Sequence, residues 1–283
     1  MERVAVIGCG LMGSGIAEVL ARHGADVLVI ERDADAIASG NQRIEKSLSR
    51  AVASGKMPEE DANRARGNLR FSDDFTLLSD RELVIEAVAE DEDTKVEVFK
   101  KLDQYVESPD AILATNTSSI PIIKLAMVTK RPQQVIGMHF FNPVPVLKLV
   151  EVISSLLTSK ETTQRVEEYA EQVLEKKVIA SQDRAGFVVN ALLIPYLLSA
   201  IRMLESGFAS AEDIDTGMVL GCAHPLGPLA LTDLIGLDTT LAVADSLYAE
   251  FKESHLAPPP LLSRMTQAGL LGRKSGQGFY SYK

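Results

Sequence analysis

The sequence has no tryptophan, few other aromatic residues and only two cysteines, and each shortage excludes a class of function. Aromatic residues make up 5% of the chain, which argues against a surface that stacks nucleobases. Cys9 and Cys222 cannot supply a disulfide framework or a cysteine-rich metal site. Their scarcity fits a reducing, cytoplasmic environment, and we expect no bound metal.

Positive net charge and long apolar runs are also missing. The formal net charge is −10, so nucleic acid and anionic membrane surfaces are poor partners. No apolar run reaches the roughly 18 residues of a membrane span, and a strand-like run begins almost at once, so we expect neither an anchor nor a signal peptide. The 283 residues, 46% of them hydrophobic, suit one large globular domain or two.

A glycine-rich motif follows the first apolar run. Residues 3–7 are typical of a strand buried in a parallel sheet, and a G-x-G-x-x-G motif and a helical pattern come next. Such glycines allow a tight turn, close approach of a pyrophosphate and packing of the helix on the strand. The residues that we expect at the cofactor are Gly8, Gly10, Leu11, Met12 and Gly13. The alternative is a glycine turn in another α/β fold, and Cys9 is interpreted as a packing residue within the loop.

Glu31 ends the second apolar run, residues 26–30, about 20 residues after the motif. An acid at this place accepts hydrogen bonds from the adenosine ribose and repels a 2′-phosphate, which favours NAD. Arg32 weakens the preference for NAD because an Arg here can accommodate the 2′-phosphate of NADP.

Residues 34–67 carry no strand signal and predict a helical hairpin inserted in the sheet order. It is locally basic within an acidic protein, through Arg43, Lys46, Arg50 and Lys56. One interpretation is an ordinary solvated face, and the other is a docking site for an anionic ligand.

Later apolar runs also end in polar residues. Because the carboxyl ends of parallel strands face the ligand crevice of a doubly wound sheet, we expect these residues along one rim: Glu90, Asn116, Ser118 and His139. For Asn116 and Ser118, the alternative is capping of a helix near Pro121.

His139 follows the strand-like run 135–138, and Glu151 lies within the next such run, 147–153. Two prolines between them, Pro143 and Pro145, stiffen a turn that could bring the side chains face to face. A carboxylate that orients a histidine suits acid–base chemistry. Taken alone, the pair favours the plainer interpretation of a hydrogen-bonded His and a solvent-facing Glu.

The β–α pattern stops near residue 185. We therefore predict two domains: a Rossmann-like, doubly wound, mostly parallel sheet over 1–184 and an all-helical domain over 185–283. In the second domain the pattern predicts an apolar helix interrupted by Pro195, a turn over 221–228 and one helix over 229–247.

Two features of the second domain stay open. Asn190 is either an ordinary helix-surface residue or a polar group aimed at the cleft between the domains. The glycine-rich tail, residues 272–280, is either a flexible end or a loop that closes over the cofactor.

Taken together, the chain resembles the 3-hydroxyacyl-CoA dehydrogenase family over essentially its whole length, which is close to that of the short bacterial form. The strings that carry the resemblance are VAVIGCGLMGSGIA at 4–17, NTSS at 116–119, HFFNPVPVLKLVE at 139–151, GFVVNALLIPYL at 186–197, EDIDTGMVLGCAHPLGP at 212–228, GLDTT at 236–240 and GRKSGQGFYSY at 272–282.

The resemblance implies a role for each matching residue. His139 and Glu151 match the family's catalytic pair, Ser118 the serine that contacts substrate and cofactor, and Asn190 the asparagine that binds substrate. Further cofactor contacts are implied at Glu31, Glu90, Lys95, Asn116, Asn142 and Lys274. Coenzyme A contacts are implied at Ser47, Arg50 and Lys56, although Ser54 stands where relatives often have Lys.

The implied activity is NAD-dependent, or alternatively NADP-dependent, interconversion of an (S)-3-hydroxyacyl-CoA and the 3-oxoacyl-CoA. The expected substrate is 3-hydroxybutyryl-CoA, in fatty acid or butanoate metabolism, and the expected assembly is a cytoplasmic homodimer formed through the C-terminal domain. Two rivals stay open: a dehydrogenase of a free hydroxy or sugar acid on the same fold, and a non-catalytic NAD-binding structural protein.

Overall fold

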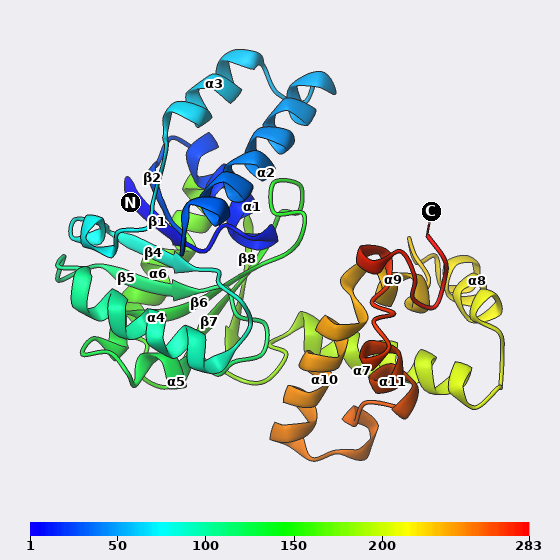
Figure 1. Ribbon diagram of the computed structural model, residues 1–283. Helices are drawn as coiled ribbons and strands as arrows, with labels where there is room; N and C mark the ends of the chain where they lie inside the picture. The colour runs from blue at the N-terminus through cyan, green and yellow to red at the C-terminus, as the bar shows by residue number, and fades with distance from the viewer. Residues whose placement is uncertain (283) are drawn as a thin grey trace. The chain divides into compact units, whose positions relative to one another are not determined.

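A computed structural model describes residues 1–282 and divides into two compact units, Met1–Asp183 and Arg184–Lys283. The first unit is built on an eight-stranded sheet in the order β3-β2-β1-β4-β5-β6-β7-β8 (Figure 1). Its strands are β1 (Arg3–Ile7), β2 (Asp26–Ile30), β3 (Leu69–Ser72), β4 (Leu83–Glu86), β5 (Ile112–Thr115), β6 (Val135–Phe140), β7 (Leu149–Ser154) and β8 (Lys177–Gln182). Its helices are α1 (Leu11–Arg22), α2 (Ala34–Ala53), α3 (Glu59–Gly67), α4 (Glu92–Tyr105), α5 (Ile122–Ala126) and α6 (Lys160–Glu168), with short turns η1 (Phe75–Leu78), η2 (Pro132–Gln134) and η3 (Tyr169–Val173).

The direction of the strands explains where polar residues gather. From β3 through β6 every neighbouring pair is parallel, so the carboxyl ends of these strands meet at one edge. The chain order reverses between β1 and β4, which is the switch point where doubly wound sheets bind ligands. Strand β7 is antiparallel to β6, and β8 is parallel to β7. The predicted mostly parallel, Rossmann-like sheet is confirmed.

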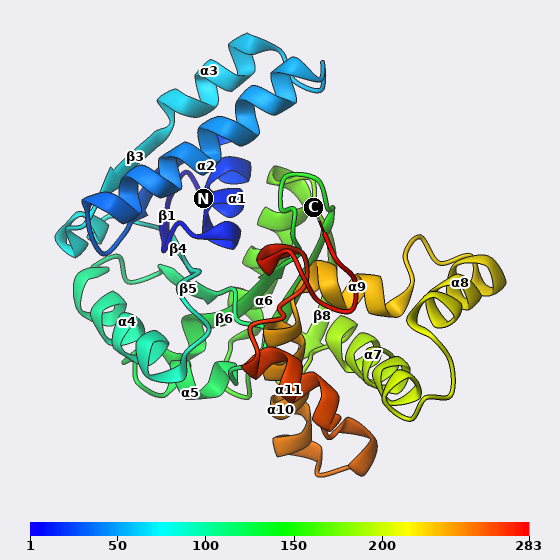
Figure 2. The same ribbon diagram turned by 45° about the vertical axis from the view of Figure 1, so that its right-hand side comes forward.

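Apolar side chains cover both faces of the central strands. In β1, Val4, Ala5 and Val6 are fully buried, as expected for a run without polar alternation. One core cluster joins strand residues to side chains from α1, α2, α3 and α6. Figures 1 and 2 show α4 and α5 on the opposite face of the sheet from α6.

Helices α2 and α3 form the predicted hairpin and lie side by side in both views (Figures 1 and 2). The Asp33 carboxylate caps α2 by accepting the Ala36 N–H at 2.8 Å. Ile44 and Leu48 of α2 are buried in the core, while most of the other side chains of that helix face solvent. Packing of one apolar stripe therefore holds the hairpin to the sheet and leaves its charged face exposed.

The second unit consists of helices: α7 (Val189–Glu205), α8 (Ala211–Cys222), α9 (Pro228–Ile235), α10 (Leu237–Phe251) and α11 (Pro260–Gln267), with turns η4 (Ser254–Leu256) and η5 (Arg273–Ser275). The predicted all-helical domain is confirmed, but two details were wrong. Helix α7 continues through Pro195. The single helix expected over 229–247 is two, because Gly236, with φ +105°, ends α9 and starts α10.

The glycine-rich tail is folded onto its own unit, so of the two alternatives left open for it the flexible end is wrong. The buried Asp233 carboxylate accepts the backbone N–H groups of Phe279 and Tyr280, each at 2.9 Å. A Cβ added at Gly278 would lie 2.0 Å from an oxygen of that same carboxylate. The tail therefore needs glycine in order to wrap around Asp233.

Candidate active site

His139 and Glu151 face each other across β6 and β7. The antiparallel register pairs the two residues directly, and His139 Nδ1 lies 2.7 Å from Glu151 Oε2. His139 is 5% exposed and Glu151 is fully buried. The plainer interpretation, a Glu that faces solvent, is therefore wrong. A buried carboxylate held against one ring nitrogen fixes the orientation of the imidazole.

Ser118 lies on the other side of the same imidazole. Its Oγ is 3.3 Å from His139 Nε2, so the ring is bracketed by a carboxylate and a hydroxyl. Ser118 comes from the loop after β5, which runs parallel beside β6. Ser118 and His139 therefore lie together, as we expected for polar residues at the carboxyl ends of neighbouring parallel strands.

The capping interpretation of Asn116 and Ser118 is wrong. The N–H groups of Ile122 and Ile123 at the start of α5 are accepted by the Asp183 carboxylate, at 2.8 and 2.7 Å. Asn116, which is 8% exposed, instead accepts the Phe140 N–H through Oδ1 at 2.8 Å. It therefore ties the loop after β5 to the strand that carries the histidine.

The turn between His139 and Glu151 is held by a residue that the sequence analysis missed. Lys176, 9% exposed, donates from Nζ to the carbonyls of Val144 and Leu147, at 2.6 and 2.7 Å. Burial, and then the charge of Arg22, lower the pKa of Lys176. Asn142 in the same turn is exposed, and its contact with the cofactor stays a prediction.

A cavity of about 710 Å³ opens at the switch point between β1 and β4. Gly8, with φ +89°, turns the chain at the end of β1, and a Cβ at Gly10 would meet no atom within 4 Å, which leaves the backbone open to a ligand. A Cβ at Gly13 would lie 1.9 Å from the Gly8 carbonyl oxygen, so only glycine lets α1 start here. These features fit a dinucleotide pyrophosphate at the start of α1.

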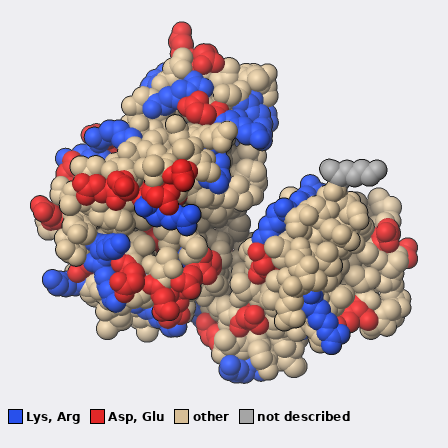
Figure 3. All heavy atoms as spheres, in the orientation of Figure 1, with Lys and Arg blue, Asp and Glu red and all other residues tan. Residues whose placement is uncertain are grey.

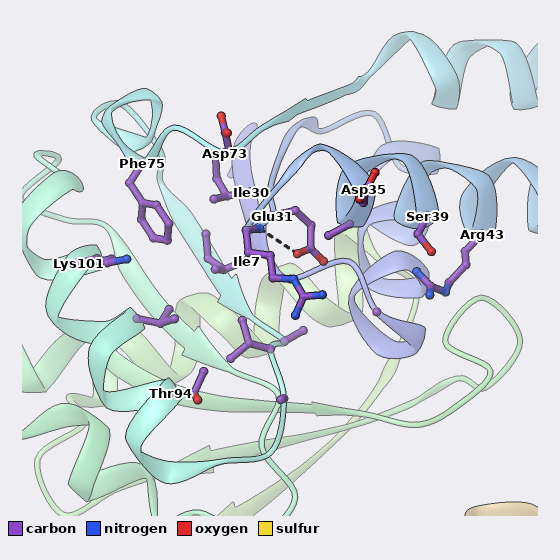
Figure 4. Close-up of a pocket in the computed structure, with 18 residues that line it drawn as sticks. Ile7, Ile30, Glu31, Asp35, Ser39, Arg43, Asp73, Phe75, Thr94 and Lys101 are labelled. Carbon is purple, nitrogen blue, oxygen red and sulfur yellow. Dashed lines mark hydrogen bonds between the residues drawn. The ribbon is translucent and has the colours of Figure 1, made fainter. Parts of the chain in front are cut away.

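Glu31 lines this cavity beside Asp35, Ser39 and Arg43 of α2, opposite Phe75 and Lys101 (Figure 4). Its Oε1 accepts the Cys9 N–H at 2.5 Å, and its Oε2 accepts the Arg32 N–H at 3.1 Å. The carboxylate is thereby anchored to the glycine-rich loop. Burial, assisted by the charge of Glu31, raises the pKa of Cys9 to about 12, so this thiol is an inert packing group.

The basic hairpin residues do not act together. Arg43 turns to the cavity, where its guanidinium donates to the Cys9 carbonyl at 3.2 Å. Arg50 and Lys56 are exposed, and Figure 3 shows Lys and Arg side chains over this hairpin with acidic ones beside them. Ser47 is half-buried and hydrogen-bonds Glu18; burial raises the pKa of Glu18, and that hydrogen bond partly offsets the rise.

Glu90 and Lys95 belong to a network of ion pairs and hydrogen bonds in which Lys95 is buried and the Glu90 side chain is 32% exposed. Lys95 is 1% exposed, with Nζ 2.6 Å from Glu86 and 3.3 Å from Glu90. Glu90 in turn accepts hydrogen bonds from the loop after β5. A direct cofactor contact by either residue stays a prediction, and the structure places Lys95 behind Glu90. Glu86, a fully buried acid inside an apolar run, was missed.

Asn190 and Lys274 belong to the second unit. Asn190 is the second residue of α7 and is half-buried, while Lys274 forms an ion pair with Asp238. Their roles toward substrate and cofactor stay predictions. The described part of the chain holds no group of three or more His, Cys, Asp or Glu side chains arranged to bind a metal ion.

Comparison with known families decides between the remaining dinucleotide-binding classes. Residues 3–184 match the family model of the 3-hydroxyacyl-CoA dehydrogenase NAD-binding domain, and residues 186–282 match that of the C-terminal domain. The chain belongs to the 3-hydroxyacyl-CoA dehydrogenase family. Its first unit is thus the NAD-binding domain of a dehydrogenase.

Relatives support this assignment over the full length. A 3-hydroxybutyryl-CoA dehydrogenase of Mycobacterium tuberculosis is 58% identical over 282 residues, covering 100% of this chain and 99% of the relative. The human mitochondrial hydroxyacyl-coenzyme A dehydrogenase is 41% identical over 299 residues, covering 100% and 92%. The crystal structure of an (S)-3-hydroxybutyryl-CoA dehydrogenase from Ralstonia eutropha has a TM-score of 0.94 at 44% identity, covering 100% and 99%. No helix within residues 1–282 has both the length and the apolar character needed to cross a bilayer.

Proposed function

We propose that this dehydrogenase interconverts (S)-3-hydroxybutyryl-CoA and acetoacetyl-CoA. The observation that supports it most is the bracketed imidazole, with Glu151 at 2.7 Å and Ser118 at 3.3 Å from the two nitrogens of His139. The names of the full-length relatives point to the same substrate, and fatty acid or butanoate metabolism is the expected setting.

The geometry assigns a role to each nitrogen of His139. An ionised Glu151 can only accept a hydrogen bond, so Nδ1 carries the proton and Nε2 is left with its lone pair. Nε2 then takes the proton of the 3-hydroxyl group, and Glu151 stabilises the imidazolium that forms. In the reverse direction the imidazolium returns this proton to the nascent alkoxide. Bound NAD supplies the hydride acceptor.

Two further side chains orient the substrate in this proposal. Ser118 lies close enough to Nε2 to share a hydrogen bond with the reacting oxygen. Asn190 is assigned to a second substrate oxygen on the strength of the family resemblance alone. Both residues position polar atoms and transfer no proton themselves.

NAD is the proposed cofactor in preference to NADP. Glu31 lines the cavity and is held by two backbone N–H groups, so its charge stays where a ribose would bind and a 2′-phosphate would be repelled. Arg32 is the feature that argues the other way, since its side chain also lines the cavity.

Coenzyme A and the assembly complete the proposal. We assign the phosphates of coenzyme A to Ser47, Arg50 and Lys56, of which Arg50 and Lys56 are exposed on the hairpin.

We also propose a cytoplasmic homodimer formed through the second unit, because that unit leaves large apolar side chains exposed: Leu192, Phe208, Leu220 and Leu234.

The test is the loss of NADH absorbance on addition of acetoacetyl-CoA to the purified protein. We expect rapid loss with NADH and slower loss with NADPH at the same concentration. No loss with either cofactor would contradict the proposal, and faster loss with NADPH would overturn the cofactor assignment alone.

A further inference from the structure

Helix α2 packs directly against the glycine-rich turn that follows β1. A Cβ added at Gly40 would lie 2.6 Å from Cys9 Cβ and 2.7 Å from Cys9 Sγ, so only glycine lets the helix come this close to the turn. Cys9 is fully buried at this contact. The contact therefore holds the next turn of α2 beside the glycine-rich loop.

Arg43 lies in that next turn of α2, on the face of the helix that lines the cavity (Figure 4). Its guanidinium reaches the glycine-rich loop and donates from Nη1 to the Cys9 carbonyl at 3.2 Å. A guanidinium has five N–H donors, so this one bond leaves others to meet a ligand. Arg43 is therefore a cation held beside the loop from the helix opposite it.

Acidic side chains make the same cavity unfavourable for an anion. Three carboxylates line it, those of Glu31, Asp35 and Asp73. Each phosphate of a dinucleotide pyrophosphate carries a negative charge, and the start of α1 offers it only backbone N–H groups and the helix dipole. A positive side chain close to the loop would offset the repulsion from these carboxylates.

Three cations line the cavity within residues 1–282, and two of them have other partners. Arg32 pairs with Asp33 at 3.0 Å, and the Lys101 ammonium lies over the Phe75 ring, 5.1 Å from its centroid. The third, Arg43, forms no ion pair in that range and is the one of the three whose side chain bonds the glycine-rich loop. Its charge is therefore available to an anion bound there.

We propose that Arg43 binds the pyrophosphate of the dinucleotide, together with the backbone N–H groups at the start of α1. A guanidinium suits this task because its fork of N–H donors matches a pair of phosphate oxygens. The inference deepens the proposed function and rests on its cofactor, not on its acyl substrate. The family resemblance implies no role for Arg43, whereas it assigns Arg50 and Lys56 of the same hairpin to coenzyme A.

The test compares Arg43→Met with Arg64→Met. Both remove one guanidinium from the α2–α3 hairpin, but Arg64 lies on α3, is 67% exposed and pairs with Asp61. Arg43→Met should raise the Kd for NADH, measured by fluorescence titration, about tenfold, as expected for the loss of a hydrogen bond to a charged group. Its kcat at saturating NADH should stay within about twofold, because a contact that ground state and transition state share changes binding alone. Arg64→Met should match the parent protein.

Ligands that differ in their phosphates identify the group that Arg43 binds. ADP-ribose keeps the pyrophosphate, so its Kd should rise in Arg43→Met as much as the Kd for NADH does. Adenosine has no phosphate and should displace NADH with the same affinity from both proteins, and NADPH should weaken by the same factor as NADH. A larger loss for NADPH would assign Arg43 to the 2′-phosphate, and an equal loss for adenosine would mean general damage to the cavity. Either result would overturn the inference, as would an unchanged Kd for NADH.

Coenzyme A also contains a pyrophosphate, so the acyl substrate is tested separately. The KM for acetoacetyl-CoA at saturating NADH should be the same in Arg43→Met and in the parent protein. A higher KM for acetoacetyl-CoA with unchanged NADH affinity would overturn the inference, because Arg43 would then bind coenzyme A. The NADH titrations need no substrate, so they decide the role of Arg43 even if the protein does not reduce acetoacetyl-CoA, a result that would contradict the proposed function alone.

Discussion

The molecule carries its charges in two contrasting ways within the same unit. Along the strand ends the charged and polar groups are bonded to one another, and most of them are buried. This rim cluster comprises the buried Glu86, Lys95, His139 and Glu151, the half-buried Ser118, and Glu90, whose side chain is 32% exposed. On the hairpin, Arg50 and Lys56 are exposed and form no ion pair within residues 1–282. The first arrangement fixes atoms in place, and the second supplies only an electrostatic field.

This difference predicts how each region responds to mutation. In the rim cluster, one lost partner leaves a buried group unsatisfied, so effects should be large and dependent on geometry. On the hairpin, solvent and salt screen each charge, so effects should be small and dependent on ionic strength. The predictions below test this contrast, beginning with the largest expected effect.

His139→Gln should lower kcat for acetoacetyl-CoA reduction about 10²- to 10⁴-fold, the usual contribution of a general acid or base. Affinity for NADH should change little, because His139 does not line the glycine-rich cavity. Steady-state kinetics and a fluorescence titration with NADH measure the two effects.

The matched control is His255→Gln. His255 also pairs with a carboxylate, Glu253 at 3.4 Å, but both side chains are 59% exposed. This variant should keep parental kinetics, and near-normal turnover of His139→Gln would contradict the assignment of the base.

Much of the rim cluster follows from the sequence because of one geometric rule. Polar residues directly after apolar runs, such as Ser118 and His139, meet wherever the runs are neighbouring parallel strands. The fold class followed from the same apolar runs. The pairing of His139 with Glu151 could not be predicted in the same way. It depends on the antiparallel register of β6 and β7, and the spacing of the two residues in the sequence does not determine that register.

The missed residues share a physical reason. Glu86 lies inside an apolar run, and Lys176 follows a helical pattern, so neither is marked by its neighbours as functional. Their roles come from partners distant in the chain: Thr115 for Glu86, and the carbonyls of Val144 and Leu147 for Lys176. The break at Gly236 was missed because apolar helical spacing continues across it.

Glu151→Gln should lower kcat less than His139→Gln does, by about tenfold, because the base remains and the amide oxygen of Gln can still accept a hydrogen bond from Nδ1, while the charge that stabilises the imidazolium is lost. Steady-state kinetics of acetoacetyl-CoA reduction measure this loss. Glu253→Gln is the exposed control, and an unchanged kcat in Glu151→Gln would count against the pair.

The smallest effect is expected on the hairpin. Charge reversal in Arg50→Glu/Lys56→Glu should raise the KM for acetoacetyl-CoA about three- to tenfold at low salt, with kcat nearly unchanged, because exposed charges contribute little once screened. The rise should shrink at high ionic strength, and a small 3-oxo substrate without coenzyme A should be unaffected.

Lys100→Glu/Lys177→Glu changes net charge equally at two exposed lysines of the same unit, which are 52% and 78% exposed. If this control raises the KM as much as the hairpin variant does, the effect comes from the overall field and the hairpin is no binding site. If the hairpin variant also impairs the substrate without coenzyme A, its charges support the fold rather than the phosphates. A rise confined to the hairpin variant and to the CoA ester would show that an exposed pair of charges, separate from the rim cluster, selects the substrate.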